Sequence, residues 1–175
     1  MNNIDVRLDS DPFEVTVGGL SRHDLKSELS SRQIHLNAQA QILLDDAVFD
    51  DANTQHVITV VVRNVSDLGL PHGATLSQIF DAAQGFGLKL CPPTSGPYLR
   101  LAVTKQEGST DPVMSRGRAP EGSYTVAAQT LRDDDEYPKG FYLRAVNGQS
   151  LLRAYRCDDT HIWSPDDQFI FRQHP

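Results

Sequence analysis

The chain has 175 residues, of which 39% are hydrophobic and 22% are charged, and its formal net charge is -7 at pH 7. This length and composition allow it to bury a core of its own, and they exclude both an intrinsically disordered chain and a membrane protein. The excess of acidic residues disfavours non-specific binding to nucleic acids, because affinity for phosphates comes from lysine and arginine.

Three features point to a cytoplasmic protein. The longest apolar stretch, residues 57–62, is far shorter than the roughly 20 residues that cross a bilayer. The first residues lack the basic and then apolar segments of a secretory signal. Cys91 and Cys157 lie far apart and neither belongs to a CxxC pair, so we expect two unpaired thiols in a reducing compartment.

The first third of the chain predicts a strand followed by two helices. Residues 13–17 alternate apolar and polar side chains, as a short strand does. Ser21 and Asp24 form a capping-box-like start for a helix over 22–31. Asn37 can cap a second helix, whose apolar positions Ala40, Leu43 and Leu44 follow helical spacing. We therefore expect a strand and a helix-turn-helix unit in residues 1–55.

The middle of the chain predicts a strand and a third helix. Residues 57–65 are β-branched and nearly continuous, which is typical of a central strand covered on both faces. Thr75 and Gln78 form a second capping box, and the helix they start ends before Gly87, which suits a left-handed cap.

The second half of the chain reads mainly as strands, at 98–104, 124–131, 141–146, 149–155 and 169–171. Asn147-Gly148 is the strongest local signal, since this pair favours a type I′ hairpin turn. Residues 105–121 are too long for an ordinary connection, and we expect a mobile or functional loop there. The predicted fold class is α+β, with the helix pair and third helix packed on a mainly antiparallel sheet or partly open barrel. Residues 56–175 would form an α+β domain with a β-rich C-terminal half, or the whole chain one compact body.

The hairpin predicts a binding surface. With Asn147-Gly148 in the turn, residue 144 pairs with 151 and residue 142 with 153, which places one set of side chains on the face opposite the predicted core face. Arginine and tyrosine can bind anionic groups and stack on aromatic ones. Adding the strand at 98–104, the candidate ligand-binding or partner-binding residues are Tyr98, Arg100, Tyr142, Arg144, Arg153 and Tyr155. The alternative is a structural sheet face whose arginines pair with surplus carboxylates.

Catalytic and metal motifs are missing from the sequence. No HExxH, GxSxG or Walker A motif occurs, and the six histidines lack metal-ligand spacing. The acidic turn at 158–161, together with Asp166 and Asp167, could hold a divalent ion but reads more simply as a solvated turn. We therefore assign no catalytic residue, no metal site and no cofactor.

Several segments resemble a family of uncharacterised bacterial proteins. They include GLSRHDLKSEL, LGLPHGAT, GLKLCPPTSGPYLRL, APEGSYTVA, PKGFYLRAVNGQSLLRAYR and IWSPDDQFIF. Members of that family sometimes carry an automatic helicase label. This chain has neither the length nor the phosphate-binding loop of a helicase, so we do not expect that activity.

A second resemblance concerns the predicted helix pair. The stretch LSRHDLKSELSSRQI is similar to the first half of a SAP-type helix-extension-helix module, through Leu25, Lys26, Leu29, Arg32 and Ile34. SAP modules bind DNA, so the resemblance implies a nucleic-acid partner. The second predicted helix departs from the module, because it leads into an acidic segment and lacks the expected basic and glycine positions.

Three functions follow from these observations. The leading one is a non-enzymatic binding or adaptor protein that recognises a protein or an anionic small molecule through the Tyr/Arg face and the loop at 105–121. The second is a small-molecule-binding domain or enzyme with a cleft between helices and sheet that brings together Arg100, Arg144, Asp158 and His161. The third, disfavoured by charge, is a nucleic-acid-associated accessory protein. The sequence leaves the oligomeric state open.

Overall fold

Helices and one extended sheet make up the α+β fold of the computed structural model, which describes residues 8, 12–51, 54–106, 108, 119–120 and 122–174. The helices are α1 (Arg22–Ser31), α2 (Ala38–Leu44), α3 (Leu76–Gly85) and α4 (Ser95–Ala102), with short 3₁₀ turns η1 (Ala47–Phe49) and η2 (Ser66–Leu68). The strands are β1 (Phe13–Val17), β2 (His35–Leu36), β3 (His56–Asn64), β4 (Leu88–Lys89), β5 (Tyr124–Val126), β6 (Gly140–Val146), β7 (Gln149–Tyr155) and β8 (Gln168–Gln173).

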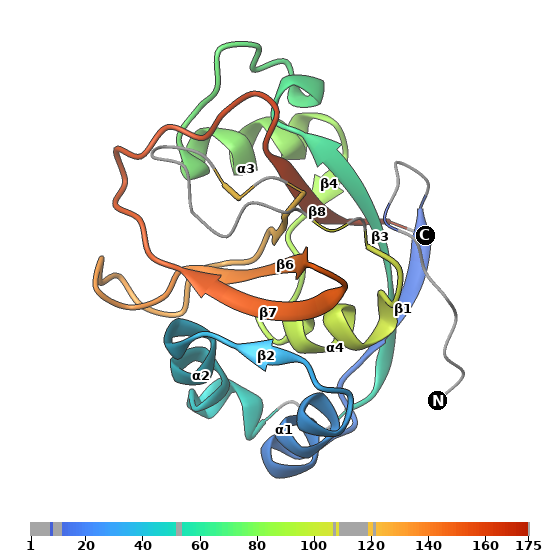
Figure 1. Cartoon of the computed structure of the whole chain (residues 1–175). Helices are drawn as coiled ribbons and strands as arrows, with labels where there is room; N and C mark the ends of the chain where they lie inside the picture. The colour runs from blue at the N-terminus through green and yellow to red at the C-terminus, as the bar shows by residue number, and fades with distance from the viewer. Residues whose placement is uncertain are drawn as a thin grey trace.

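The sheet is open and strongly curled (Figure 1). Its strand order is β1-β3-β8-β5-β6-β7-β2, with β4 pairing β8 off this path. Among the described strands the pairs are antiparallel except for β5 with β8 and β2 with β7. The N-terminal strand β1 and the C-terminal strand β8 therefore flank the same central strand, β3.

Local signals in the sequence place the first three helices correctly. The Ser21 side chain accepts a hydrogen bond from the backbone N–H of Asp24 and starts α1. Asn37 caps α2 through the N–H of Ala40. The capping box of Thr75 and Gln78 starts α3, as the sequence predicts. Each cap satisfies backbone donors that lack a partner at a helix start, so these boundaries are set locally.

The Asn147-Gly148 hairpin is confirmed in detail. Both residues have positive φ, 50° and 79°, as a type I′ turn requires. The register pairs Val146 with Gln149 and continues to Gly140 with Tyr155. The turn thus fixes which residues meet at the open end of the hairpin.

The predicted strand at 98–104 is wrong, because residues 95–102 form the helix α4. Every residue of α4 except Ala102 is buried, so the helix shows no polar face in the sequence. The alternation of Tyr98, Leu99, Arg100 and Leu101 then imitates a half-exposed strand. The strand predicted at 124–131 is also shorter, ending at Val126.

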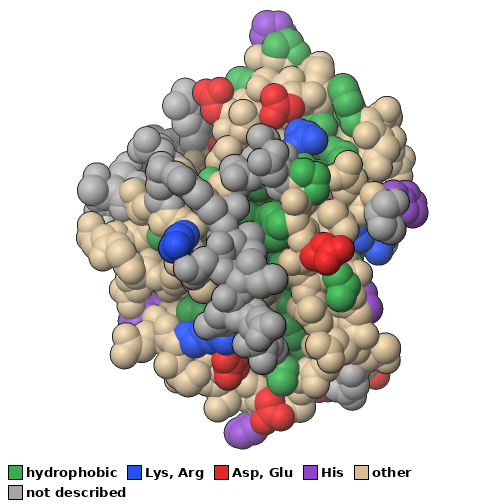
Figure 2. All heavy atoms as spheres, turned by 90° about the vertical axis from the view of Figure 1, so that its right-hand side faces the viewer, with side chains coloured by type: hydrophobic (Ala, Val, Ile, Leu, Met, Phe, Trp, Pro, Cys, Tyr) green, Lys and Arg blue, Asp and Glu red, His purple; other side chains and the backbone are tan. Residues whose placement is uncertain are grey.

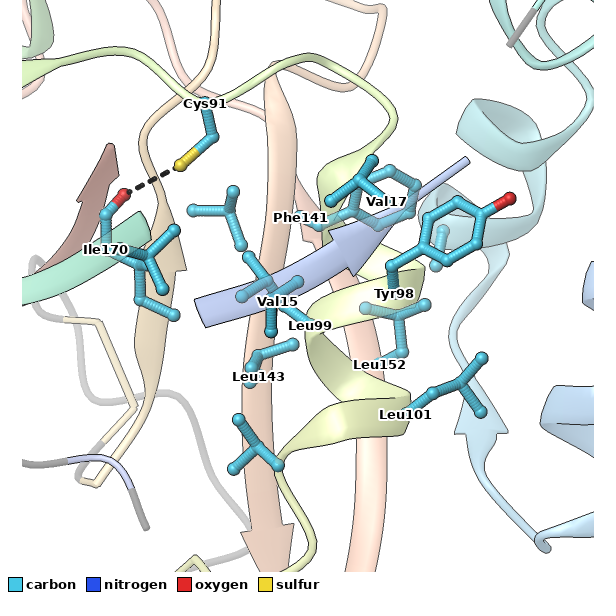
Figure 3. Close-up of a cluster of buried hydrophobic side chains, with 14 of the residues drawn as sticks. Val15, Val17, Cys91, Tyr98, Leu99, Leu101, Phe141, Leu143, Leu152 and Ile170 are labelled. Atoms are coloured by element: carbon cyan, nitrogen blue, oxygen red, sulfur yellow. Dashed lines mark hydrogen bonds between the residues drawn. The ribbon is translucent and has the colours of Figure 1, made fainter. Parts of the chain in front are cut away.

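One hydrophobic cluster joins the beginning and the end of the chain. It contains Val15 and Val17 of β1, Leu25 of α1, Leu99 of α4 and Ile170 of β8. Figure 3 shows part of this cluster, with the Cys91 thiol directed at the carbonyl of Ile170, 3.6 Å away. Buried side chains from 1–55 and from 56–175 therefore share one core.

A second cluster lies between α3 and the sheet. It includes Ile79 and Ala83 of α3 together with Trp163, Phe169 and Phe171. Trp163 packs edge-on against Phe169 at 5.0 Å between ring centroids, which agrees with an architectural role for this residue. The side of α3 that carries Ile79 and Ala83 is buried in this cluster. The adjacent side of the helix lines a cavity.

Most of the loop predicted at 105–121 lies outside the described residues. Within the described part of the chain, no helix has the length and apolar character that a membrane span requires.

Candidate functional site

The residues of the predicted Tyr/Arg face do not form an exposed surface. Tyr98 and Arg100 lie on α4, and Tyr142 and Arg144 lie on β6, and all four are buried. Arg153 and Tyr155 on β7 are half-buried. The prediction that these side chains form one accessible sheet face is wrong, since β6 is buried on both of its faces from Gly140 to Ala145.

Arg100 nevertheless does meet the β6–β7 hairpin. The residue is 1% exposed, and its guanidinium donates hydrogen bonds to the carbonyls of Arg144 at 3.2 Å and Leu151 at 3.4 Å. It also donates to the Val103 carbonyl at 2.6 Å and to Oε1 of Gln106 at 2.7 Å. Desolvation lowers the pKa of Arg100 to about 10, so the side chain stays protonated at neutral pH.

Gln106 extends this buried network. Its Nε2 donates to the carbonyls of Gly122 at 2.8 Å and Leu143 at 3.0 Å. The Gln106 side chain therefore connects Arg100 to the carbonyls of residues 122 and 143. These hydrogen bonds hold α4 against the β6–β7 hairpin, which is a structural role.

The remaining members of the predicted face point to other parts of the fold. The Tyr98 hydroxyl accepts a hydrogen bond from the backbone N–H of Leu20 at 3.3 Å. Tyr155 packs edge-on against Trp163, with 5.3 Å between ring centroids. Tyr142 stands opposite Arg153 in the hairpin register. The structure therefore brings Arg100 to the hairpin but does not gather the six residues at one accessible site.

The strongest candidate site is a cavity of about 520 Å³ between α3 and the loops at the ends of the sheet. This volume is within the usual range for small-molecule sites. In Figure 1 the segment that follows β7 runs up toward α3. The cavity is lined by Leu76, Ser77, Phe80, Asp81, Leu90, Gln129, Thr130, Asp133, Lys139, Cys157, Asp158 and Asp159.

One side of α3 forms the first wall. Leu76 and Phe80 are one turn apart, as are Ser77 and Asp81, so the four side chains lie on neighbouring rows of the helix. Leu76 and Phe80 are half-buried, whereas Ser77 and Asp81 are exposed. This wall therefore combines an apolar strip with a polar rim.

The open end of the β6–β7 hairpin forms the opposite wall. The backbone N–H of Lys139 donates to the Tyr155 carbonyl at 2.8 Å, one step beyond the Gly140–Tyr155 pair. The chain then continues from Tyr155 to Cys157 and the two aspartates that follow. The hairpin register thus places Lys139 next to the segment at 157–159.

Lys139 is the buried cation of this cavity. Its side chain is only 6% exposed, and its Nζ lies 3.6 Å from Oδ1 of Asp135, whose side chain is 63% exposed. An ammonium has three donors and is costly to bury without acceptors. Lys139 therefore places a positive charge in a cavity wall that also contains apolar side chains.

Carboxylates dominate the rest of the charged lining, namely Asp81, Asp133, Asp158 and Asp159. Hydrogen bonds from the Thr160 side chain and backbone, at 2.7 and 2.9 Å, lower the pKa of Asp158 and keep it ionised. With four carboxylates and one ammonium, the cavity attracts positive charge and repels simple anions.

Cys157 is a poor nucleophile in this setting. Burial raises the pKa of its thiol, and nearby Asp158, Asp135 and Asp159 raise it further, while Lys139 lowers it. The thiol is therefore protonated at neutral pH. Cys91 is buried and its thiol pKa is raised to about 12, also by desolvation.

The predicted acidic turn does not assemble a metal site. No group of three or more potential metal ligands occurs among the residues that the structure describes. The His161 ring instead packs edge-on against Trp163 at 5.3 Å. Of the four residues expected to share a cleft, Asp158 lines the cavity, whereas Arg100 and Arg144 meet at the α4–β6 contact.

The helix pair carries ion pairs that occupy its basic side chains. Arg22 pairs with Asp50 at 2.5 Å, Lys26 pairs with Asp45, and Arg32 pairs with Glu28 at 2.8 Å. On the face drawn in Figure 2, the acidic and basic side chains of the described residues are interspersed. Neither feature favours a phosphate-binding surface.

Sequence reasoning missed Lys139 and the α3 wall as site residues. The hairpin register, extended by three pairs beyond residues 142 and 153, places Lys139 opposite Arg156, the residue before Cys157. The spacing of Leu76, Ser77, Phe80 and Asp81 on the predicted third helix was a second available signal. Only the packing of α3 against the hairpin end brings these two signals together.

The chain matches no protein-family model, no curated protein sequence and no solved structure. The geometry of the described residues is therefore the basis for a functional proposal.

Proposed function

We propose that this protein is a small-molecule-binding protein whose cavity takes an organic molecule with an amino group and an apolar part. The observation that carries the proposal is the 520 Å³ cavity, whose lining combines Leu76, Phe80 and Leu90 with a rim of carboxylates. Apolar walls with a few placed polar groups are typical of small-molecule sites.

The charges favour an amine over other ligand classes. Carboxylates at Asp81, Asp133, Asp158 and Asp159 outnumber the one lysine in the lining. An ammonium group gains from this potential, whereas a lone carboxylate or phosphate is repelled by it. The aromatic ring of Phe80 adds a surface on which an apolar or cationic group can pack.

Binding without covalent chemistry fits the state of the thiol. The raised pKa of Cys157 leaves it protonated, so it is not an activated nucleophile. A binding role through the Tyr/Arg face receives less support, because Tyr98, Arg100, Tyr142 and Arg144 are buried.

Three probes of similar size test the proposal, because they share one ring and differ in charge: phenethylamine, 2-phenylethanol and phenylacetate. We expect phenethylamine to bind most tightly in calorimetry and to shift the amide resonances of Ser77, Thr130 and Cys157. An Asp81→Asn variant should weaken phenethylamine binding by about 2- to 5-fold, a modest loss because the charge is exposed.

The exposed Asp166→Asn variant serves as the matched control, because Asp166 lies outside the cavity lining and is also exposed. It should bind phenethylamine as the wild type does. Absence of phenethylamine binding at millimolar concentration, or tighter binding of phenylacetate, would contradict the proposal.

A further inference from the structure

The environment of Lys139 narrows the ligand class further, on the basis of the proposed amine-binding cavity. The Lys139 side chain is only 6% exposed, and Lys139 lines the cavity. Within the part of the chain that the structure describes, its Nζ makes no hydrogen bond, and its one ion pair is at 3.6 Å. That distance exceeds the usual N–H···O range.

The Lys139 ammonium reaches the cavity without an acceptor at hydrogen-bond distance among the described residues. The partial desolvation of this group is best offset by a charged or strongly accepting oxygen within hydrogen-bond distance. Asp135 is largely exposed and is not part of the cavity lining, so it does not fill the space in front of the ammonium. A ligand oxygen inside the cavity would do so.

The ligand group that accepts a hydrogen bond from Lys139 cannot be the only charged group of the ligand. Four carboxylates line the same cavity, among them Asp81 on α3 and Asp158 and Asp159 after β7. A purely anionic ligand would gain one ion pair with Lys139 and face four repulsive charges. A ligand that carries both an ammonium and a carboxylate satisfies both signs of charge.

The apolar lining supplies the third element of recognition. Leu76 and Phe80 lie on the α3 wall, and Leu90 directly follows β4. These side chains suit an apolar or aromatic group attached to the charged part of a ligand. Ammonium, carboxylate and apolar side chain together define an amino acid or a small zwitterion of similar shape.

We infer that the cavity binds apolar amino acids or closely related zwitterions, with the ligand carboxylate on Lys139 and the ligand ammonium at the aspartates. Lys139 is then the residue that separates zwitterions from simple amines. The rim aspartates separate both of these from simple acids.

The test compares L-phenylalanine with phenethylamine, which lacks only the carboxylate, by calorimetry at pH 7. We expect wild-type protein to bind phenylalanine at least 10-fold more tightly. Lys139→Met should bring the two dissociation constants within 2-fold of each other, and Lys139→Arg should retain the preference for phenylalanine. Lys89→Met, an exposed lysine on β4, is the matched control and should behave as the wild type does.

The wild-type comparison decides the matter even if Lys139→Met fails to fold. Equal or weaker binding of phenylalanine relative to phenethylamine would overturn the zwitterion inference while leaving the amine-binding proposal intact. Binding of neither compound would overturn both. Retained 10-fold preference in folded Lys139→Met would overturn the role of Lys139.

Discussion

The hydroxyl of Tyr137 donates a hydrogen bond of 2.6 Å to Oδ2 of Asp46, 91 positions away in the chain. Asp46 also caps η1 through the N–H of Val48. The guanidinium of Arg132 lies 4.3 Å from the centroid of the Tyr137 ring and 3.5 Å from Oδ2 of Asp46. This contact fixes the segment between residues 132 and 139, which supplies Asp133 and Lys139 to the cavity.

Replacement of Tyr137 by Phe should lower the free energy of unfolding by about 1–2 kcal/mol, because it removes a charge-assisted hydrogen bond from a half-buried carboxylate. Urea denaturation at pH 7 measures this loss. The Tyr137 hydrogen bond is the main reason that the pKa of Asp46 is lowered below 3.8.

The same variant predicts a change in acid stability. A lowered pKa in the folded state gives stability that is fully present above the unfolded pKa of 3.8 and is lost as pH falls through the folded value. The stability difference between wild type and Tyr137→Phe should therefore narrow below about pH 4. A difference that stays constant down to pH 2 would refute this linkage.

Gly96→Ala should destabilise the fold by about 1–3 kcal/mol, because overpacking in a core forces neighbours to move. A Cβ at Gly96 would lie 2.5 Å from Cδ2 of Phe141. The control is Gly85→Ala in α3, where a Cβ meets nothing within 4 Å. That change should be neutral or stabilising by up to about 1 kcal/mol. Thermal unfolding of both variants checks the prediction, and equal effects would contradict the close packing of α4 on β6.

Arg100→Met should destabilise the protein by at least about 2 kcal/mol, since it leaves buried oxygens without their donor. The affected acceptors include the carbonyls of Val103 and Leu151 and the side chain of Gln106. The exposed Arg156→Met variant is the control and should change stability by less than about 0.5 kcal/mol. An Arg100→Met protein as stable as the wild type would show that desolvation of the cation cancels its hydrogen bonds.

Cys157 should react slowly with iodoacetamide at pH 7.5, because its thiol pKa is raised by burial and by nearby aspartates. Asp159→Asn removes one of those charges and should speed the reaction, whereas Lys139→Met removes the charge that lowers the pKa and should slow it. Mass spectrometry of labelled peptides measures both rates, with unfolded protein as the reference for full reactivity. A faster reaction in Lys139→Met would contradict the electrostatic role of this lysine.

The β6–β7 hairpin is an element whose geometry can be predicted from a few consecutive residues. Asn147-Gly148 determines the turn type, and the turn determines the register from Val146–Gln149 to Gly140–Tyr155. The first three helices are predicted for the same reason, because Ser21, Asn37 and Thr75 satisfy helix-start donors a few residues away. Interactions of such short range are encoded in consecutive residues.

Only the tertiary structure shows that Tyr98 and Arg100 are buried. Because α4 is buried on nearly all sides, its sequence lacks a polar helix face and resembles that of a strand. Hydrogen bonds to Gln106 and to distant carbonyls offset the cost of burying Arg100. The cavity likewise required α3 to pack near the hairpin end, so that Phe80 and Lys139 line one space. By itself the sequence determined the α+β class, the helix starts and the hairpin register, since each depends on neighbours in the chain. Which charged side chains are buried, and which of them share a site, depends on contacts between segments far apart in sequence.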